Sequence, residues 1–365
     1  MSNTHVPGKA GKRILKVIMC CFLVLFTLFL MAVVGLGMAC NLILNGPSKN
    51  ARNALTVSLL ASDTTAWIPS LFLDEQTLAQ IQAGETVLQP EAVPDAPQVV
   101  INFESGTTDQ WADYPDGIRI ETIHGRTYTA HVMLIRDPSR VYLATSSDSF
   151  NISINGNRIF GQMQKEGAIA AINGGAFNDD GTANSYIGSL PLGMVVAEGE
   201  ILWDDGKSYD GFVGLTEDHT LVVADTIDRS TVKKLKIRDG CCFGPVLVAD
   251  GKVNESVYDT NTSFNARTAI GQRADGVIIF LCIDGRQAGS LGATYIDVAQ
   301  IMEELGAVNA CNLDGGASTV MTYKDTYGLY GNAGDAVMCS SYALIQASPR
   351  RMPTFFMVRA SEGEE

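Results

Sequence analysis

Residues 277–319 read VIIFLCIDGRQAGSLGATYIDVAQIMEELGAVNACNLDGGAST, and this stretch decides the fold. Two apolar runs, at 277–283 and 307–313, predict strands. Between them, apolar side chains recur at helical spacing, at Val298, Ile301, Met302 and Leu305. A strand, a helix and a strand in this order form a βαβ unit. We therefore expect the two strands to run parallel and to be joined by a right-handed crossover.

The ends of the predicted helix carry signals of their own. Thr294 stands three residues before Asp297, which resembles a capping box with Asp in place of the usual Glu. Gly306 follows the last apolar position and is a natural C-terminal cap. The helix is therefore predicted to run from Thr294 to Leu305.

An aspartate directly follows each of the two strands. Asp284 begins an Asp-Gly-Arg triplet, and Asp314 begins an Asp-Gly-Gly triplet. Parallel strands end at the same edge of a sheet and neighbouring strands lie ~4.8 Å apart, so the two carboxyls are expected roughly 5–10 Å from each other. That range includes the separations of paired carboxylates in glycosidases. An Asp-Gly pair alone is a common turn, and only the placement of both at one edge favours a site.

Other polar residues are expected at the same edge. A third apolar run, 168–172, leads into Asn173-Gly174-Gly175, where glycines allow backbone N–H groups to turn towards an anion. Arg267 precedes the hairpin that leads to Asp284, and it is either a salt-bridge partner of the aspartates or an anion ligand. Further candidates for contact with a substrate are Arg286, Gly315, Gly316, Ser318 and Thr319.

The chain beyond residue 99 consists of short apolar runs separated by Gly, Asp and Asn. Further strands are predicted at 132–135, 141–144, 168–172, 193–196, 212–215, 221–224 and 245–249. Asp-Gly pairs at 205–206, 250–251 and 275–276 are typical of hairpin turns. The predicted fold class is α+β, with a mixed, largely antiparallel sheet and a βαβ unit near the C-terminus, preceded by one transmembrane helix.

The N-terminal region differs in composition from the rest. Its only charged residues are Lys9, Lys12, Arg13 and Lys16, and an uncharged apolar run, 17–44, follows them. That run exceeds the ~20 residues that cross a bilayer as a helix. Basic residues before the span and acidic ones after it place the N-terminus in the cytoplasm. A cleaved signal peptide is the rival interpretation, although its apolar core is ~7–15 residues long and this run is about twice that.

These patterns divide the chain into four parts: a basic cytoplasmic tail, 1–16, a transmembrane helix, 17–44, a stalk or linker, 45–98, and an extracytoplasmic domain, 99–365. With 26 basic and 40 acidic residues, the formal net charge is −14, which argues against a nucleic-acid-binding protein because phosphates would be repelled. The 8 cysteines are too few for a disulfide scaffold of this length. Cys282 and Cys311 lie in apolar runs and are predicted to be buried thiols.

No cysteine or histidine spacing typical of a metal site is present, and no cofactor is predicted. Asn178, Asp179 and Asp180 gather oxygen ligands that suit Ca²⁺, but a solvated turn is the favoured interpretation. The histidines are scattered and are not assigned to the site, namely His124, His131 and His219.

Five motifs together resemble the phosphodiester glycosidase family. They are AINGGAF at 171–177, CFGPVL at 242–247, NARTAIG at 265–271, DGR at 284–286 and NLDGGAST at 312–319. They stand in the family's order, and the resemblance covers roughly residues 120–360. Ala176 and Ala317 depart from it mildly, because an aromatic residue and a third glycine are common there.

The resemblance implies a bacterial surface protein that hydrolyses a sugar 1-phosphodiester at the anomeric carbon, acting on cell-surface or exopolysaccharide glycans. The leaving group is a phosphomonoester with a second pKa near ~6, so it needs charge stabilisation more than protonation. Arg267, Arg286 and the glycine-loop amides are the candidates for that stabilisation. Asp314 and Asp284 are the candidate catalytic carboxylates, in either order of roles, and Asn173 would bind a sugar hydroxyl or a water.

Two other classes of function are compatible with the sequence. The first is a non-catalytic module that binds phosphate-linked wall or capsule polymers through a local arginine site. The second is a structural surface protein, which the gathering of polar groups at strand ends disfavours. The bilayer, through residues 17–44, and a carbohydrate phosphodiester are the predicted partners; no protein partner is predicted.

Overall fold

The computed structural model describes residues 9–46, 52, 55–56, 59–60, 65–82, 110–178, 187–207, 211–259, 263–285, 289–324 and 349–361. The chain divides into two compact units, Met1–Gln89 and Pro90–Glu365, and each is described by itself. The predictions for Arg286 and for the Asp179-Asp180 pair lie outside the described residues, as does the predicted boundary at 98–99.

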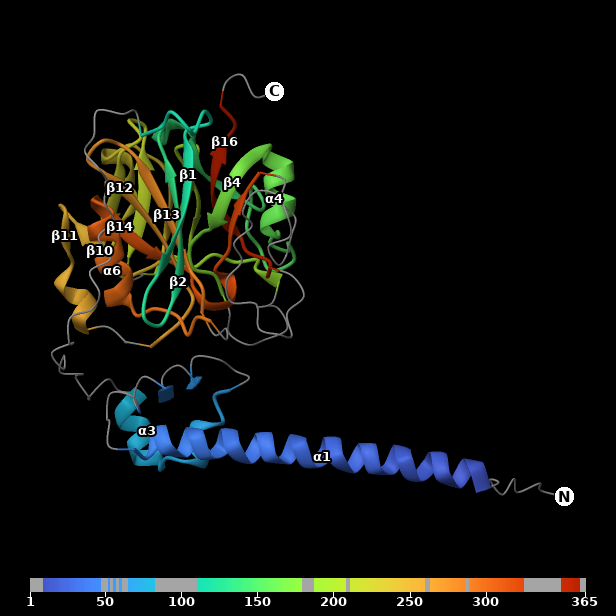
Figure 1. Ribbon diagram of the computed structural model, residues 1–365. Helices are drawn as coiled ribbons and strands as arrows, with labels where there is room; N and C mark the ends of the chain where they lie inside the picture. The colour runs from blue at the N-terminus through green and yellow to red at the C-terminus, as the bar shows by residue number, and fades with distance from the viewer. Residues whose placement is uncertain are drawn as a thin grey trace. The chain divides into compact units, whose positions relative to one another are not determined.

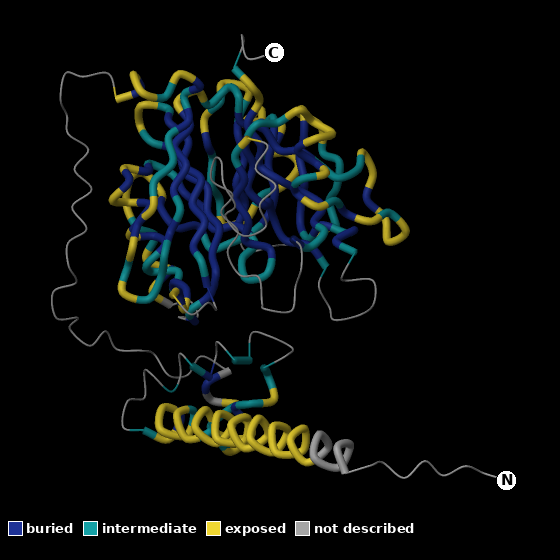
Figure 2. The backbone as a smooth tube through the Cα atoms, turned by 45° about the vertical axis from the view of Figure 1, so that its right-hand side comes forward, coloured by how far each residue is buried: buried dark blue, intermediate teal, exposed yellow. Residues whose placement is uncertain are grey.

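The N-terminal unit is built on helix α1, Lys9–Leu44 (Figure 1). A 3₁₀ turn at Pro69–Leu71 and helix α3, Glu75–Gln82, complete its described elements. The stretch Lys16–Leu44 is long and apolar enough to cross a membrane, and its side chains are almost all exposed (Figure 2). A signal sequence has the same character, so α1 is a candidate span that begins before the predicted 17–44.

The C-terminal unit contains three sheets. The seven-stranded sheet has the order β1-β2-β13-β12-β14-β10-β11, with bounds Ile118–His124, Thr129–Ile135, Ile278–Ile283, Arg267–Arg273, Ala307–Leu313, Val246–Ala249 and Lys252–Val253. The four-stranded sheet is β15-β4-β16-β3, with bounds Met321–Tyr323, Ala168–Asn173, Thr354–Arg359 and Val141–Thr145. The five-stranded sheet is β6-β5-β9-β7-β8, with bounds Glu200–Asp204, Met194–Ala197, Ile237–Cys242, Phe212–Thr216 and Leu221–Ala224. The predicted α+β class with largely antiparallel sheets is confirmed (Figure 1).

The predicted βαβ unit consists of β13, α6 (Tyr295–Glu304) and β14. β12 lies between β13 and β14 and pairs antiparallel with both, so the two strands run in the same direction without being neighbours. Their backbones are therefore two strand spacings apart, ~10 Å, at the upper end of the roughly 5–10 Å expected between the carboxyls. The capping box is confirmed, because Thr294 Oγ1 accepts the Asp297 N–H at 3.2 Å and Asp297 Oδ2 accepts the Thr294 N–H at 2.7 Å.

One hydrophobic core joins the three sheets. Phe280 of β13, Ile172 of β4 and Leu215 of β7 belong to the same buried cluster, so one face of each sheet turns inward. Helix α6 covers the other face of the seven-stranded sheet, where Leu281 and Met302 share a second cluster. Successive residues of a strand point to opposite faces, which is why Phe280 and Leu281 enter different clusters. Figure 2 shows that the buried residues run through the middle of the C-terminal unit.

Smaller elements complete the unit. Helix α4, Ile159–Glu166, contacts β4, and helix α5, Arg229–Lys234, contacts β9. Three further 3₁₀ turns occupy Pro138–Arg140, Glu255–Asp259 and Gly316–Ser318. Cys282 and Cys311 are buried free thiols, as predicted.

Two of the three predicted Asp-Gly hairpins are confirmed, at Asp250-Gly251 between β10 and β11 and at Asp275-Gly276 between β12 and β13. The prediction for Asp205-Gly206 is wrong, because β6 before it pairs with β5 and not with the following β7. The turn between β5 and β6 is Glu198-Gly199, whose φ values of 53° and 80° suit the primed turns of tight hairpins.

Candidate functional site

The predicted site residues meet at one edge of two facing sheets. The carboxyl ends of β13, β14 and β4 lie there together with the amino ends of β2, β12 and β16. Hydrogen bonds tie these ends to one another: Asp284 N–H donates to Thr129 O at 2.8 Å, and Asp314 N–H donates to Gly174 O at 3.2 Å. Gly174 N–H donates in turn to Thr354 O at 2.9 Å. The structure thus brings Asp284, Asp314 and Asn173-Gly174-Gly175 to one place.

The backbone at Ala266 leaves no room for a side chain on the residue after either aspartate. Ala266 enters β12 between Gly285 and Gly315, and a Cβ on either glycine would collide with the Ala266 main chain. Gly316, at φ 59°, donates its N–H to Ala266 O at 2.9 Å. Asp284-Gly285 and Asp314-Gly315 are therefore not hairpin turns. In each pair the glycine allows the end of the strand to pack closely against the backbone at Ala266, which lies between the two aspartates.

Asp284 contacts a histidine that the sequence did not assign to the site. His131 of β2 lies directly opposite Cys282 of β13, and its Nε2 is 3.1 Å from Asp284 Oδ2. Both side chains are mostly buried, with 14% and 17% exposed. The sequence signal for this contact is the alternation of side chains along the strands. His131 lies on the same strand face as Met133, and Asp284 lies on the same face as Cys282. That signal becomes informative only once β2 and β13 are known to be neighbours.

Asn173 is a fully buried junction between strands. Its Oδ1 accepts the Thr268 hydroxyl at 2.8 Å and the Val320 N–H at 3.2 Å, and its Nδ2 donates to Asp314 O at 2.6 Å. One amide therefore fixes the main chain of Asp314 relative to β12 and to the start of β15. Through these bonds Asn173 positions the site, whatever it also offers a substrate.

Gly174 and Gly175 allow neighbouring backbone to pack closely against the end of β4. Gly175 N–H donates to Thr354 Oγ1 at 3.1 Å, and Gly174 N–H donates to the carbonyl of the same residue. A Cβ on Gly174 would collide with Thr354, and one on Gly175 would lie 2.6 Å from Cys242 O. Both N–H groups are thus engaged within the fold, so their predicted role as anion donors would require these bonds to open.

Arg267 lies on the opposite face of the seven-stranded sheet from the Asp284–His131 contact. Its guanidinium stacks on the Tyr295 ring of α6, 3.9 Å from the ring centroid. Its Nε donates to Ala293 O at 3.1 Å and its Nη2 to Ser263 O at 2.8 Å. Burial lowers the pKa of this guanidinium, while Tyr295 acts in the opposite direction. These contacts join the 263 and 293 segments, and none of them is an ion pair with Asp284.

The segment after Asp314 turns back into the core. Gly316–Ser318 form a 3₁₀ turn, in which Ser318 N–H donates to Gly315 O at 3.1 Å. Ser318 and Thr319 are both buried. Within the described part of the chain, Ser318 Oγ is buried without a hydrogen-bond partner.

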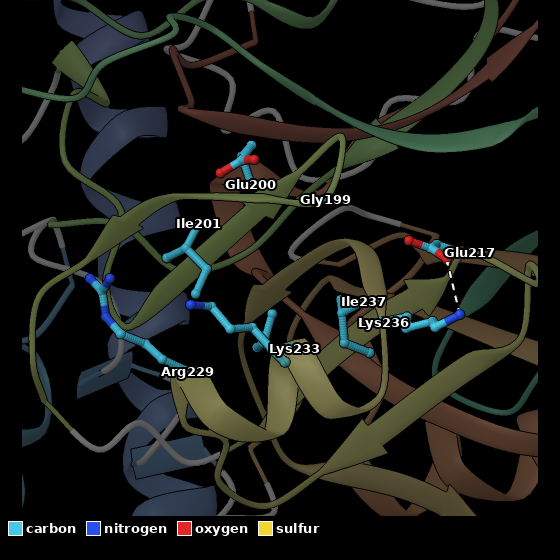
Figure 3. A pocket seen from close by; sticks show the side chains of 9 residues that line it. Gly199, Glu200, Ile201, Glu217, Arg229, Lys233, Lys236 and Ile237 are labelled. Carbon is cyan, nitrogen blue, oxygen red and sulfur yellow. Dashed lines mark ion pairs between the residues drawn. The ribbon is translucent and has the colours of Figure 1, made fainter.

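A hollow of ≈ 340 Å³ lies elsewhere, beside α5 and the start of β9 (Figure 3). Figure 3 shows Arg229, Lys233 and Lys236 lining it, with Lys236 Nζ 3.7 Å from Glu217 Oε2. None of the predicted site residues lines it. Among the residues that the structure describes, no group of three or more His, Cys, Asp or Glu side chains is placed to hold a metal ion.

Residues 166–359 match the phosphodiester glycosidase family, a match that covers more than half of the chain. The chain belongs to this family. The fold agrees, because the catalytic domain of zebrafish N-acetylglucosamine-1-phosphodiester alpha-N-acetylglucosaminidase, auto-inhibited by its pro-peptide, superposes with a TM-score of 0.53 at 20% identity, over 67% of this chain and 82% of that one.

Two curated relatives also match. A SPbeta prophage-derived uncharacterized protein, YomE, of Bacillus subtilis is 26% identical over 52% of this chain and 28% of its own length. N-acetylglucosamine-1-phosphodiester alpha-N-acetylglucosaminidase of Mus musculus is 24% identical over 61% of this chain and 46% of its own length. The matched region thus spans less than half the length of either relative.

Proposed function

We propose that the protein is a membrane-anchored, extracytoplasmic hydrolase that cleaves sugar 1-phosphodiesters at the anomeric carbon, in cell-surface or exopolysaccharide glycans. Membership of the phosphodiester glycosidase family supports a phosphodiester-linked sugar as the substrate. The name of the mouse relative, an N-acetylglucosamine-1-phosphodiester glucosaminidase, supports cleavage next to C1. Asp314 and Asp284 are the proposed carboxylates, and Arg286, two residues after Asp284, is the proposed phosphate ligand.

The observation that carries the proposal is a set of polar atoms at the strand ends. His131 Nδ1, Asp284 Oδ1 and Ser318 Oγ are buried and have no hydrogen-bond partner within the described part of the chain. Each such atom costs about 1–3 kcal/mol. Two of them belong to the His131–Asp284 contact and the third to the turn after Asp314, and such atoms are expected where a ligand supplies the missing hydrogen bonds.

The chemistry follows from the bond to be broken. The departing phosphomonoester is stable as an anion, so the site must chiefly stabilise positive charge at the anomeric carbon and deliver a water. A carboxylate at the end of β14 and a proton acceptor at the end of β13 would supply these two functions. Both strand ends are fixed by main-chain hydrogen bonds, so the two groups are held ready before the substrate binds.

Hydrolysis in ¹⁸O-labelled water is expected to give a phosphomonoester without label. The reason is that attack at the anomeric carbon leaves the bridging oxygen on phosphate. The phosphomonoester is the product to analyse by mass spectrometry, because the anomeric oxygen of a free sugar exchanges with water by itself. Label in the phosphomonoester would instead show attack at phosphorus and would contradict the proposal.

The same assay tests the binding alternative. Residues 99–365 and the full chain would be compared on a panel of sugar 1-phosphodiesters, with phosphomonoester release as the readout. Saturable binding of a diester without any product would favour a non-catalytic module for phosphate-linked polymers.

The membrane part of the proposal rests on α1. Its uncharged run 17–44 follows four basic residues, which favours a cytoplasmic N-terminus. The full chain is expected to stay in the membrane pellet after an alkaline carbonate wash, at its full mass, and to be digested by protease added outside the cell. A variant lacking residues 1–44 is the matched control. If the wild type is instead released from the membrane, and its mass is lower by about that of the N-terminal apolar segment, that segment is a cleaved signal peptide.

A further inference from the structure

His131 and Asp284 form a pair whose outer atoms lack partners. Nε2 of His131 lies 3.1 Å from Oδ2 of Asp284, whereas His131 Nδ1 and Asp284 Oδ1 are buried without hydrogen bonds among the described residues. Elsewhere in the structure such atoms are usually satisfied, because leaving one unpaired costs about 1–3 kcal/mol. The pair is therefore placed to meet a further polar group.

The backbone holds the pair in place. His131 is directly opposite Cys282, and Asp284 N–H donates to Thr129 O at 2.8 Å, so β2 and β13 stay joined up to Asp284 itself. Ser290 Oγ donates to Asp284 O at 2.6 Å and accepts the Thr129 N–H at 3.0 Å. Because strands and a bridging hydroxyl fix both residues, the contact does not depend on surface side chains.

The contact also selects a tautomer. An ionised carboxylate only accepts hydrogen bonds, so the imidazole nitrogen that faces Asp284 carries the proton. In a neutral imidazole the lone pair then resides on Nδ1, the atom without a partner. The other titratable groups on this face are Cys282 across the pair and His124 on β1, whose Nδ1 lies 3.4 Å from Thr129 Oγ1. Asp314 is two strands away.

We propose that His131 is a catalytic base, which takes the proton of the water that attacks the anomeric carbon, and that Asp284 is the residue that positions it. The water oxygen bonds to C1, and the bond between C1 and the phosphate oxygen breaks with its electron pair on the departing phosphomonoester. The water proton passes to His131 Nδ1 and later to solvent. This inference rests on the proposed hydrolysis and needs no cofactor.

Direct attack by water on the anomeric carbon is a single displacement. Glycosidases that use an activated water in this way invert the configuration, whereas retaining enzymes first form a covalent glycosyl intermediate. The sugar released first should therefore have the anomeric configuration opposite to that of the substrate.

The test compares pH profiles of kcat and KM for the full chain and for His131→Gln and Asp284→Asn, on the sugar 1-phosphodiester that the wild type hydrolyses fastest. A neutral imidazole is the active form, so wild-type kcat/KM should rise with pH on the acidic side of its optimum. His131→Gln should lower kcat about 10²–10⁴-fold, leave KM nearly unchanged and abolish that acidic limb. Asp284→Asn should also lower kcat, because the imidazole loses the carboxylate that fixes its tautomer.

Two comparisons separate this role from a structural one. His124→Gln, on the neighbouring strand and away from Asp284, is the matched control and should keep the wild-type profile. The double variant His131→Gln/Asp284→Asn should be little worse than His131→Gln, because the two residues act as a unit. The configuration of the first sugar formed by the wild type, followed by proton NMR, needs no variant and so does not depend on how the variants fold.

The results distinguish failure of the His131 base assignment from failure of the proposed hydrolysis. If the wild type turns over but His131→Gln keeps its acidic limb and most of its kcat, or if the first product retains configuration, the base assignment is overturned and the hydrolase remains. If the wild type releases no phosphomonoester from any diester, both proposals are overturned.

Discussion

Asp314→Asn is expected to lower kcat for a sugar 1-phosphodiester by about 10²–10⁴-fold while the domain stays folded. The main chain of Asp314 makes its own hydrogen bonds, from its N–H to Gly174 O and to its carbonyl from Asn173. An asparagine of the same shape preserves both bonds. It removes the negative charge that would stabilise an oxocarbenium-like centre, so the loss should fall on kcat.

The measurement is phosphomonoester release at saturating substrate, together with thermal unfolding of the same samples. Asp250→Asn is the matched control, because Asp250 occupies a hairpin turn at φ 51°, a conformation that asparagine adopts readily. It should leave kcat unchanged. An Asp314→Asn protein that is folded and fully active would exclude Asp314 from the chemistry.

Asn173→Ala is expected to lower the free energy of unfolding by about 3–5 kcal/mol. The substitution leaves the Thr268 hydroxyl, the Val320 N–H and the Asp314 carbonyl without their partner in a fully buried place, at about 1–3 kcal/mol each. Because the same amide fixes the Asp314 main chain, activity should fall even at temperatures where the variant is folded.

Denaturant unfolding of the C-terminal unit measures this loss, with Asn309→Ala as the control. The Asn309 amide donates to Leu221 O at 2.9 Å and accepts the Asp250 N–H at 3.3 Å, but the residue is only half-buried. Its loss should cost about 1 kcal/mol. Equal destabilisation by the two substitutions would show that Asn173 is not the junction that the hydrogen bonds indicate.

Local pattern was enough to predict the elements around the site. The helical spacing and the Thr294–Asp297 box predicted α6, and the apolar runs predicted β13, β14 and β4. The gathering of Asp284, Asp314 and Asn173 followed from the same pattern, because each lies at the end of a strand, although Asn173 belongs to the second sheet. Their roles in catalysis or binding remain predictions.

What the sequence could not supply was the order of the strands. β12 is inserted between β13 and β14 because antiparallel pairing on both sides satisfies its backbone, and no local signal encodes that choice. The insertion places the two aspartates after strands whose backbones are two spacings apart, ~10 Å. His131 was missed for the same reason, since only the pairing of β2 with β13 brings it beside Asp284. The sequence likewise did not show which face of β12 is covered by α6. It therefore did not show that Arg267 contacts Tyr295 and not the aspartates.

The passage of Ala266 between Gly285 and Gly315 has a consequence for how such a protein can diversify. The gap between the two aspartates is measured out by one intervening strand, so the repeat of the sheet sets it and not the size of any side chain. Substitutions of the side chains around these strand ends can therefore accumulate while the two backbones keep the same separation.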